Sequence, residues 1–235
     1  MADPKRELTF LLADPERRLL RWIAARLPAW VSSDQLTALG VLAATAAGVA
    51  YALSGYRSGW LWVASVLLVV QWFGDSLDGT LARVRHAERP RYGYYLDHVV
   101  DAYSTAAIGI GLGVSPYVSL GIALGLVVVY LVLSINVYLE STVFGAFRLA
   151  YGRLGPTEIR LILIAINSGL ALQAGRSTVP VRLVADALFA AAGLGMLAML
   201  AVRFNQNLRA LARLEPLQSA RATGCDGTPD ATSPG

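Results

Sequence analysis

The stretch GDSLDGTLARVRHAERPRYGYYLDHVVDAYS, residues 74–104, places four aspartates at the ends of two otherwise apolar segments. A charged side chain inside a membrane segment is costly, so it usually has a function. Asp75 and Asp78 are spaced i, i+3, and Asp97 and Asp101 are spaced i, i+4. Each pair therefore lies on one face of a helix, about one turn apart. Antiparallel neighbouring helices joined by this short connection would bring the four carboxylates together.

The composition indicates a membrane protein with one compact helical bundle. Hydrophobic residues make up 55% of the 235-residue chain and charged residues 15%, which is typical of a polytopic membrane protein. This length holds about six spans of roughly 20 residues and no second globular domain. All twenty basic residues except Lys5 are arginines, which favours an anionic membrane surface or a phosphate-bearing substrate over nucleic acid. A single cysteine, Cys225, allows no disulfide framework.

We predict an all-α polytopic membrane protein with six transmembrane helices preceded by an N-terminal amphipathic interfacial helix. Residues 1–32 form the cytoplasmic interfacial segment, residues 33–214 the six-helix membrane domain and residues 215–235 a disordered polar tail. In the first part, Asp14 is expected to cap a helix that begins near Pro15. The predicted spans are Leu36–Leu53, Gly59–Leu77, Tyr94–Gly113, Tyr117–Tyr138, Glu158–Ala174 and Val181–Arg203.

The connections alternate between rich and poor in lysine and arginine, as the positive-inside rule requires. The N-terminal segment carries six such residues, the first loop only Arg57, the second loop four and the third loop none. Both termini and the acidic stretch are therefore predicted to face the cytoplasm. The basic loop from Arg85 to Arg91 is interpreted as a topology determinant and a contact for lipid headgroups.

The acidic cluster predicts a metal site. Four carboxylates in one partly dry site repel each other unless cations neutralise them. Their oxygen atoms favour hard divalent cations. We therefore expect one or two Mg²⁺ or Mn²⁺ ions, held by Asp75, Asp78, Asp97 and Asp101.

Small residues and an arginine accompany the acids. Gly79, Ala82 and Gly93 leave the helix surfaces bare beside the carboxylates, which lets a bulky ligand approach the backbone. Arg83 can bind phosphate oxygens with its planar guanidinium group. Metal, small residues and arginine together indicate a site for a diphosphate.

The pattern Asp75-x2-Asp78-Gly79-x2-Ala82-Arg83, nine residues, Gly93-x3-Asp97-x3-Asp101 resembles the signature of the CDP-alcohol phosphotransferases, also called CDP-alcohol phosphatidyltransferases. These are integral membrane enzymes of phospholipid synthesis. The nine-residue connection is one residue longer than the commonest form of the signature, and a loop between helices tolerates such an insertion. In the segment SSDQLT, before the first span, Asp34 stands where the family usually has asparagine.

The resemblance implies that an alcohol attacks a CDP-linked donor, forms a phosphodiester and releases CMP. It implies that Asp101 acts as the general base on the acceptor hydroxyl, besides binding one of two Mg²⁺ or Mn²⁺ ions with the other three aspartates. One of the two substrates is a lipid, and the family resemblance further implies a homodimer among membrane lipids. The residues expected to contact the CDP part are Asp75, Asp78, Gly79, Ala82, Arg83 and Gly93.

The acceptor or headgroup pocket is predicted from polar residues near the cytoplasmic ends of the spans. For each one, interfacial anchoring or helix capping is an equal interpretation. The candidates are His98, Asn136, Glu140, Arg148, Arg153, Glu158 and Arg160.

Two donor classes remain open. One uses CDP-diacylglycerol with a small polar acceptor, and the other uses CDP-choline or CDP-ethanolamine with diacylglycerol. His98, directly after Asp97, and the pair Thr157-Glu158 are similar to the second class, and His98 is also a candidate accessory base.

A membrane cation transporter is the alternative function, since an acidic cluster can form an ion site. Transporters usually carry such residues at mid-span or in broken helices. The aspartates of this chain lie at one predicted face of the membrane, which favours the enzyme.

Overall fold

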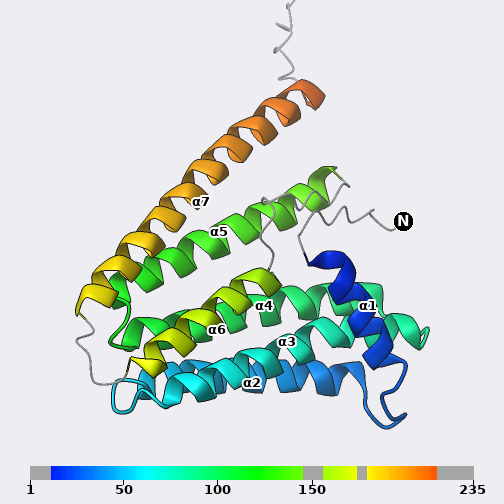
Figure 1. The fold of residues 1–235 in the computed structure, drawn as a ribbon. Coiled ribbons are helices and arrows are strands. Elements are labelled where there is room, and N and C mark those ends of the chain that lie inside the picture. The colour runs from blue at the N-terminus through cyan, green and yellow to red at the C-terminus, as the bar shows by residue number, and fades with distance from the viewer. Residues whose placement is uncertain (1–11, 145–155, 174–178, 216–235) are drawn as a thin grey trace, which may run out of the picture.

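Seven helices and no strand form the part of the chain that the computed structural model describes, residues 12–144, 156–173 and 179–215 (Figure 1). The all-α prediction is confirmed for this part. The pocket candidates Arg148 and Arg153, and the predicted tail beyond Glu215, lie outside the described residues. The helices are α1 (Ala13–Ala24), α2 (Ser33–Leu53), α3 (Trp60–Val84), α4 (Pro90–Val114), α5 (Leu120–Phe144), α6 (Pro156–Leu172) and α7 (Val179–Leu214).

Helices α2 to α7 coincide with the six predicted spans, and α3, α5 and α7 continue several residues beyond them. Four of these helices, α2, α3, α5 and α7, are long and apolar enough to cross a membrane. Helix α4 carries Asp97 and Asp101, which lower its hydropathy. Helix α6 has 17 residues, short of the roughly 20 that cross a bilayer without adjustment. Six crossings therefore stay a prediction.

Helix α2 packs against both α3 and α4. Glycines permit both close crossings. A Cβ atom on Gly74 of α3 would lie 2.5 Å from the carbonyl oxygen of Leu36 and 2.7 Å from the nitrogen of Gly40, both on α2. A Cβ atom on Gly111 of α4 would overlap the backbone of Gly48 in the same way. Because small residues let membrane helices approach closely, α2 fixes α3 and α4 relative to each other.

Helices α5 and α7 form a second pair, which diverges from α2 and α3 in Figure 1. Arg203 of α7 pairs with Glu140 of α5 at 3.1 Å. At the start of α5, the backbone N–H of Ser119 donates to Asp186 of α7 at 2.7 Å, and the serine hydroxyl donates to the same carboxylate. Polar contacts therefore join the two helices at both ends.

Helix α1 packs on the end of α3 that carries the acidic motif. Leu20 and Ala24 are buried with Leu77 and Leu81 of α3. The helix begins at Ala13 and no side chain caps it, so the predicted cap by Asp14 is wrong. That residue lies inside the first turn instead. The location of α1 at a membrane surface stays a prediction.

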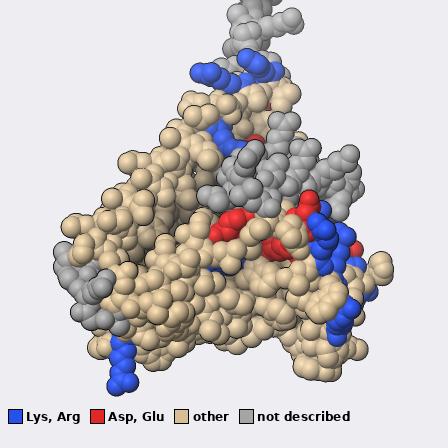
Figure 2. Space-filling model, viewed as in Figure 1, with Lys and Arg blue, Asp and Glu red and all other residues tan. Residues whose placement is uncertain are grey.

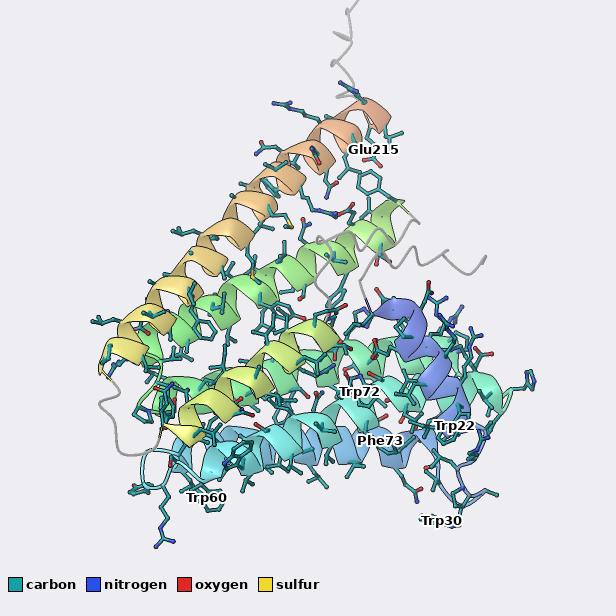
Figure 3. All side chains as sticks on the ribbon, viewed as in Figure 1. Trp22, Trp30, Trp60, Trp72, Phe73 and Glu215 are labelled. Atoms are coloured by element: carbon teal, nitrogen blue, oxygen red, sulfur yellow. The ribbon has the colours of Figure 1, made fainter. Side chains whose placement is uncertain are left out.

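Tryptophans lie at both ends of the α2–α3 pair (Figure 3). Trp60 marks one end, and Trp22 and Trp30 lie at the other. Trp22 and Trp30 are largely exposed, and Trp60 is exposed in part. Tryptophan is enriched at both interfaces of a bilayer, so this placement agrees with α2 and α3 spanning a membrane.

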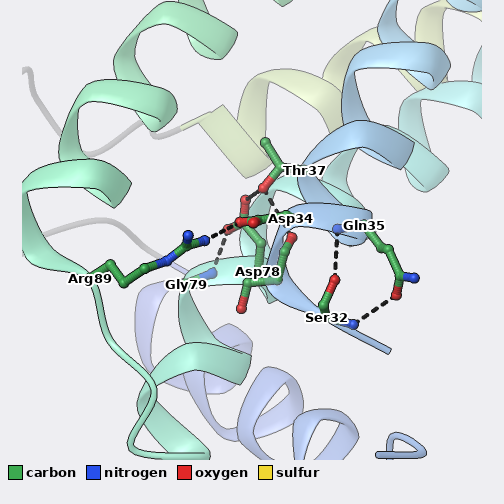
Figure 4. Close-up of polar contacts among 8 residues, drawn as sticks. Ser32, Asp34, Gln35, Thr37, Asp78, Gly79 and Arg89 are labelled. Carbon is green, nitrogen blue, oxygen red and sulfur yellow. Dashed lines mark hydrogen bonds and ion pairs between the residues drawn. The ribbon is translucent and has the colours of Figure 1, made fainter. Parts of the chain in front are cut away.

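The basic loop after α3 is fastened to the segment before α2. The guanidinium group of Arg85 donates to three backbone carbonyl oxygens in residues 27–31. Arg89 pairs with Asp34 at 2.5 Å (Figure 4). Both arginines therefore contact protein groups, which the sequence interpretation of this loop did not include.

Candidate active site

The two carboxylates of α3 are each held by a residue from another helix. Oδ2 of Asp75 accepts a hydrogen bond from Nη2 of Arg160 on α6 at 2.7 Å, and the two side chains are only 16% and 15% exposed. Asp78 accepts from the hydroxyl of Thr37 on α2 at 2.6 Å and from the backbone N–H of Gly79 at 2.5 Å (Figure 4). Hydrogen bonds to ionised groups are strong and directional, so both carboxylates are oriented by their partners.

The aspartates of α4 belong to the same cluster. Asp101 interacts electrostatically with Asp75, Asp97 and Arg160, and Asp78 interacts with Asp75 and Asp97. Figure 2 shows acidic side chains grouped at the centre of one face, next to a basic region. The aspartates of α3 and α4 therefore influence one another across the two helices, and their combination into one metal-binding site stays a prediction.

By their chemistry, the carboxylate oxygens that α3 and α4 supply suit a hard divalent cation. Within the described ranges, no group of three or more histidine, cysteine, aspartate or glutamate side chains is close enough to hold a metal ion. Asp75 is paired with Arg160, which neutralises it as a cation would. An ion bound here would therefore share Asp75 with this arginine.

The residues predicted to contact the CDP part lie on α3 and at the start of α4. Arg83 is exposed, and one guanidinium nitrogen lies 3.5 Å from the position of a Cβ atom on Gly79. The same side chain donates to Thr80 at 3.2 Å. A Cβ atom on Gly93 would meet nothing within 4 Å, and Ala82 is partly exposed. An accessible arginine beside bare backbone can receive phosphate oxygens.

Two of the predicted pocket residues reach the carboxylates. Arg160 contacts Asp75 directly. The ring of His98 lies between Tyr94 and Tyr138, with centroid distances of 4.1 Å and 4.0 Å. Its Nδ1 atom lies 3.7 Å from Asp97 and forms a 2.7 Å hydrogen bond with the carbonyl oxygen of Tyr94. The histidine is thus held beside the cluster by aromatic packing.

Of the other described candidates, Glu140 and Glu158 contact groups outside the carboxylate cluster. Glu140 pairs with Arg203 of α7. Asn136, one turn away on α5, has a buried side-chain nitrogen without a hydrogen-bond partner in the described part of the chain. Glu158 is 8% exposed and accepts from the backbone N–H of Leu12 at 2.9 Å. These contacts fasten α5 to α7 and α6 to α1.

Thr37 is a site residue that sequence reasoning missed. It is 8% exposed, and its hydroxyl is a hydrogen-bond partner of Asp78. The start of α2 is fixed by a capping box, in which Ser32 and Gln35 exchange hydrogen bonds of 3.2 Å and 2.8 Å (Figure 4). The signal was present in SSDQLT, because a threonine one turn after the start of an apolar helix can donate a hydrogen bond to a polar group of a neighbouring helix.

The fold and the site together define a helical membrane protein with a carboxylate cluster between α3 and α4. The sequence model of the CDP-alcohol phosphatidyltransferases matches residues 30–201, well over half of the chain and including all four aspartates. The chain therefore belongs to the CDP-alcohol phosphatidyltransferase family.

One curated relative is a phosphatidylinositol phosphate synthase from Cutibacterium acnes (strain DSM 16379 / KPA171202). It is 38% identical over 90 residues. The matched region covers 37% of this chain and 40% of the relative, so the chain spans less than half of that protein's length in the comparison. The similarity is therefore local.

Proposed function

We propose that this chain is a metal-dependent CDP-alcohol phosphotransferase that transfers a substituted phosphate group from a CDP-linked donor to an alcohol and releases CMP. The observation that carries the proposal is the electrostatically linked cluster of Asp75, Asp78, Asp97 and Asp101. Membership of the family supports the same reaction and favours it over cation transport.

The roles of the residues follow from their chemistry. Mg²⁺ or Mn²⁺, one or two ions held by the four carboxylates, would neutralise the charge that grows on the departing phosphate. Arg83 binds phosphate oxygens of the donor with its guanidinium group. Asp101 takes the proton of the acceptor hydroxyl, whose oxygen then bonds to the β-phosphorus of the donor. The bond from that phosphorus to the bridging oxygen breaks, and CMP leaves with this oxygen.

We further propose CDP-diacylglycerol as the donor and a small phosphorylated polyol, inositol phosphate, as the acceptor. The local similarity to the phosphatidylinositol phosphate synthase supports this pairing. Purified protein is incubated with CDP-diacylglycerol or CDP-choline and with inositol phosphate, glycerol phosphate, serine or diacylglycerol, and CMP release is measured. Release that requires CDP-diacylglycerol and inositol phosphate supports the pairing. CMP release from CDP-choline with diacylglycerol would contradict this pairing and indicate the other donor class.

Activity is expected to require Mg²⁺ or Mn²⁺. EDTA should abolish CMP formation, and either ion in excess should restore it. Asp78→Asn should lose most activity while the protein still inserts and purifies, because one anionic ligand is removed. Asp186→Asn is the matched control, since this carboxylate binds Ser119, the residue before α5, and it should keep its activity. Full turnover in EDTA would contradict the metal requirement.

We propose six crossings with both termini in the cytoplasm, and single cysteines in a Cys225→Ser background test this. A cysteine at Glu88 should react with an impermeant reagent from the cytoplasmic side, because four arginines surround that loop. Cysteines at Arg57 and Leu120, both exposed, should react from the opposite side. Labelling of Leu120 from the same side as Glu88 would show that α4 does not cross.

A further inference from the structure

A single carboxylate ties α1 to two helices of the site. Oε1 of Glu16 accepts hydrogen bonds from the indole N–H of Trp72 on α3 at 2.6 Å and from the hydroxyl of Thr157 on α6 at 2.8 Å. The hydroxyl of Ser76 on α3 is 3.5 Å from the same oxygen. Figure 3 shows Trp72 beside α1. One acceptor shared by donors from α3 and α6 fixes both helices against α1.

These hydrogen-bond donors lie within one helical turn of Asp75 or Arg160. Trp72 and Ser76 flank Asp75 on α3, and Thr157 lies one turn before Arg160 on α6. A second contact runs in the other direction, from the backbone N–H of Leu12 to Glu158. Helix α1 therefore holds the first turn of α6, from which Arg160 reaches Asp75.

Arg160 and the residues that Glu16 joins line the same groove. Glu16, Trp72, Thr157 and Arg160 all line one groove of about 330 Å³ between α1, α3 and α6. The remaining walls of this groove are mainly apolar, and the polar contacts between α1 and α6 are those of Glu16 and of Glu158. Loss of the hydrogen bonds of Glu16 would let the first turn of α6 move and take Arg160 off Asp75.

We propose that Glu16 is a positioning residue that keeps Arg160 on Asp75 and thereby sets the affinity of the carboxylate cluster for a divalent cation. The inference rests on the proposed metal-dependent function. A guanidinium group on Asp75 repels a cation that shares the same carboxylate, and this repulsion is large in a partly buried site. Loss of the ion pair between Arg160 and Asp75 should therefore raise the affinity for a cation. A substitution that only disrupts the structure of the site should lower that affinity.

The test measures Mn²⁺ binding to the purified full-length protein by electron paramagnetic resonance. Arg160→Gln should raise Mn²⁺ affinity by about three- to tenfold, and Glu16→Ala should raise it by about two- to fivefold. Glu16→Gln should stay close to the parent, because its side-chain oxygen still accepts from Trp72 and Thr157. Asp14→Asn, an exposed carboxylate on the same helix, is the matched control and should have no effect.

Glu16→Ala should add nothing in the Arg160→Gln background, because both changes act through the same guanidinium group. Unchanged or lower Mn²⁺ affinity in Glu16→Ala overturns the inference, and so do additive effects. A spin-label pair at Arg18 of α1 and Ile162 of α6, in a Cys225→Ser background, gives a second readout. Its distance distribution should broaden in Glu16→Ala and not in Asp14→Asn. If no variant binds Mn²⁺, the metal requirement fails, and an unchanged distance distribution in Glu16→Ala overturns the positioning role separately.

Discussion

Asp101→Asn is expected to lower the rate of CMP formation by about 10²–10⁴-fold while donor affinity stays within roughly tenfold of the parent. Asparagine keeps the size of the side chain and one oxygen, but it cannot take the proton of the acceptor hydroxyl. The donor would still be held by Arg83 and through cations bound by the other three aspartates. Calorimetry with the CDP-linked donor, beside an assay of CMP release, measures the two quantities separately.

Two further variants make this result specific to Asp101. Asp78→Asn and Arg83→Ala should weaken donor binding itself, because one removes an anionic ligand and the other a phosphate contact. If Asp101→Asn loses donor binding as completely as Asp78→Asn, then Asp101 is chiefly a metal ligand. His98 would be the next candidate base, since its Nδ1 atom lies 3.7 Å from Asp97.

The spacing of the aspartates predicts that each pair shares one face of its helix, because helical geometry places residues three or four apart on one face. That the four carboxylates form one metal site stays a prediction. Hydrophobic length was sufficient to place the starts of α2 to α7 within a few residues. The helix ends were less predictable. The continuation of α7 from Arg203 to Leu214 includes Arg209 and Arg213, and charged residues beyond an apolar span give no hydropathy signal for helix.

Contacts between distant segments could not be read from the sequence. Arg160 follows Asp75 by 85 residues and Thr37 precedes Asp78 by 41, so no local periodicity relates either pair. Glu16 lies in a helix whose arginines indicated a membrane surface, and nothing in that pattern indicated hydrogen bonds to α3 and α6. The aspartates were predictable because their partners are close in the sequence, whereas the residues that orient them come from other helices.

Gly74→Ala is expected to destabilise the protein by about 1–3 kcal/mol and to reduce CMP formation. The added Cβ would lie 2.5 Å from the carbonyl oxygen of Leu36 and 2.7 Å from the nitrogen of Gly40. Both are backbone atoms, so α2 or α3 must shift. The shift would act next to Asp75, the following residue. Thermal unfolding in detergent should show a midpoint lowered by roughly 3–10 °C.

A series of glycine variants separates this clash from the general effect of alanine in a helix, which is favourable by about 0.5–1 kcal/mol. A Cβ atom on Gly40 would lie 3.4 Å from the nitrogen of Asp75, so Gly40→Ala should have a small effect. A Cβ atom on Gly125 of α5 would meet nothing within 4 Å, so Gly125→Ala should be neutral or stabilising. The expected order of stability is Gly125→Ala, then Gly40→Ala, then Gly74→Ala. If Gly74→Ala unfolds at the same temperature as Gly125→Ala, α2 and α3 do not cross as closely as described, and the position of Asp75 against α2 must be revised.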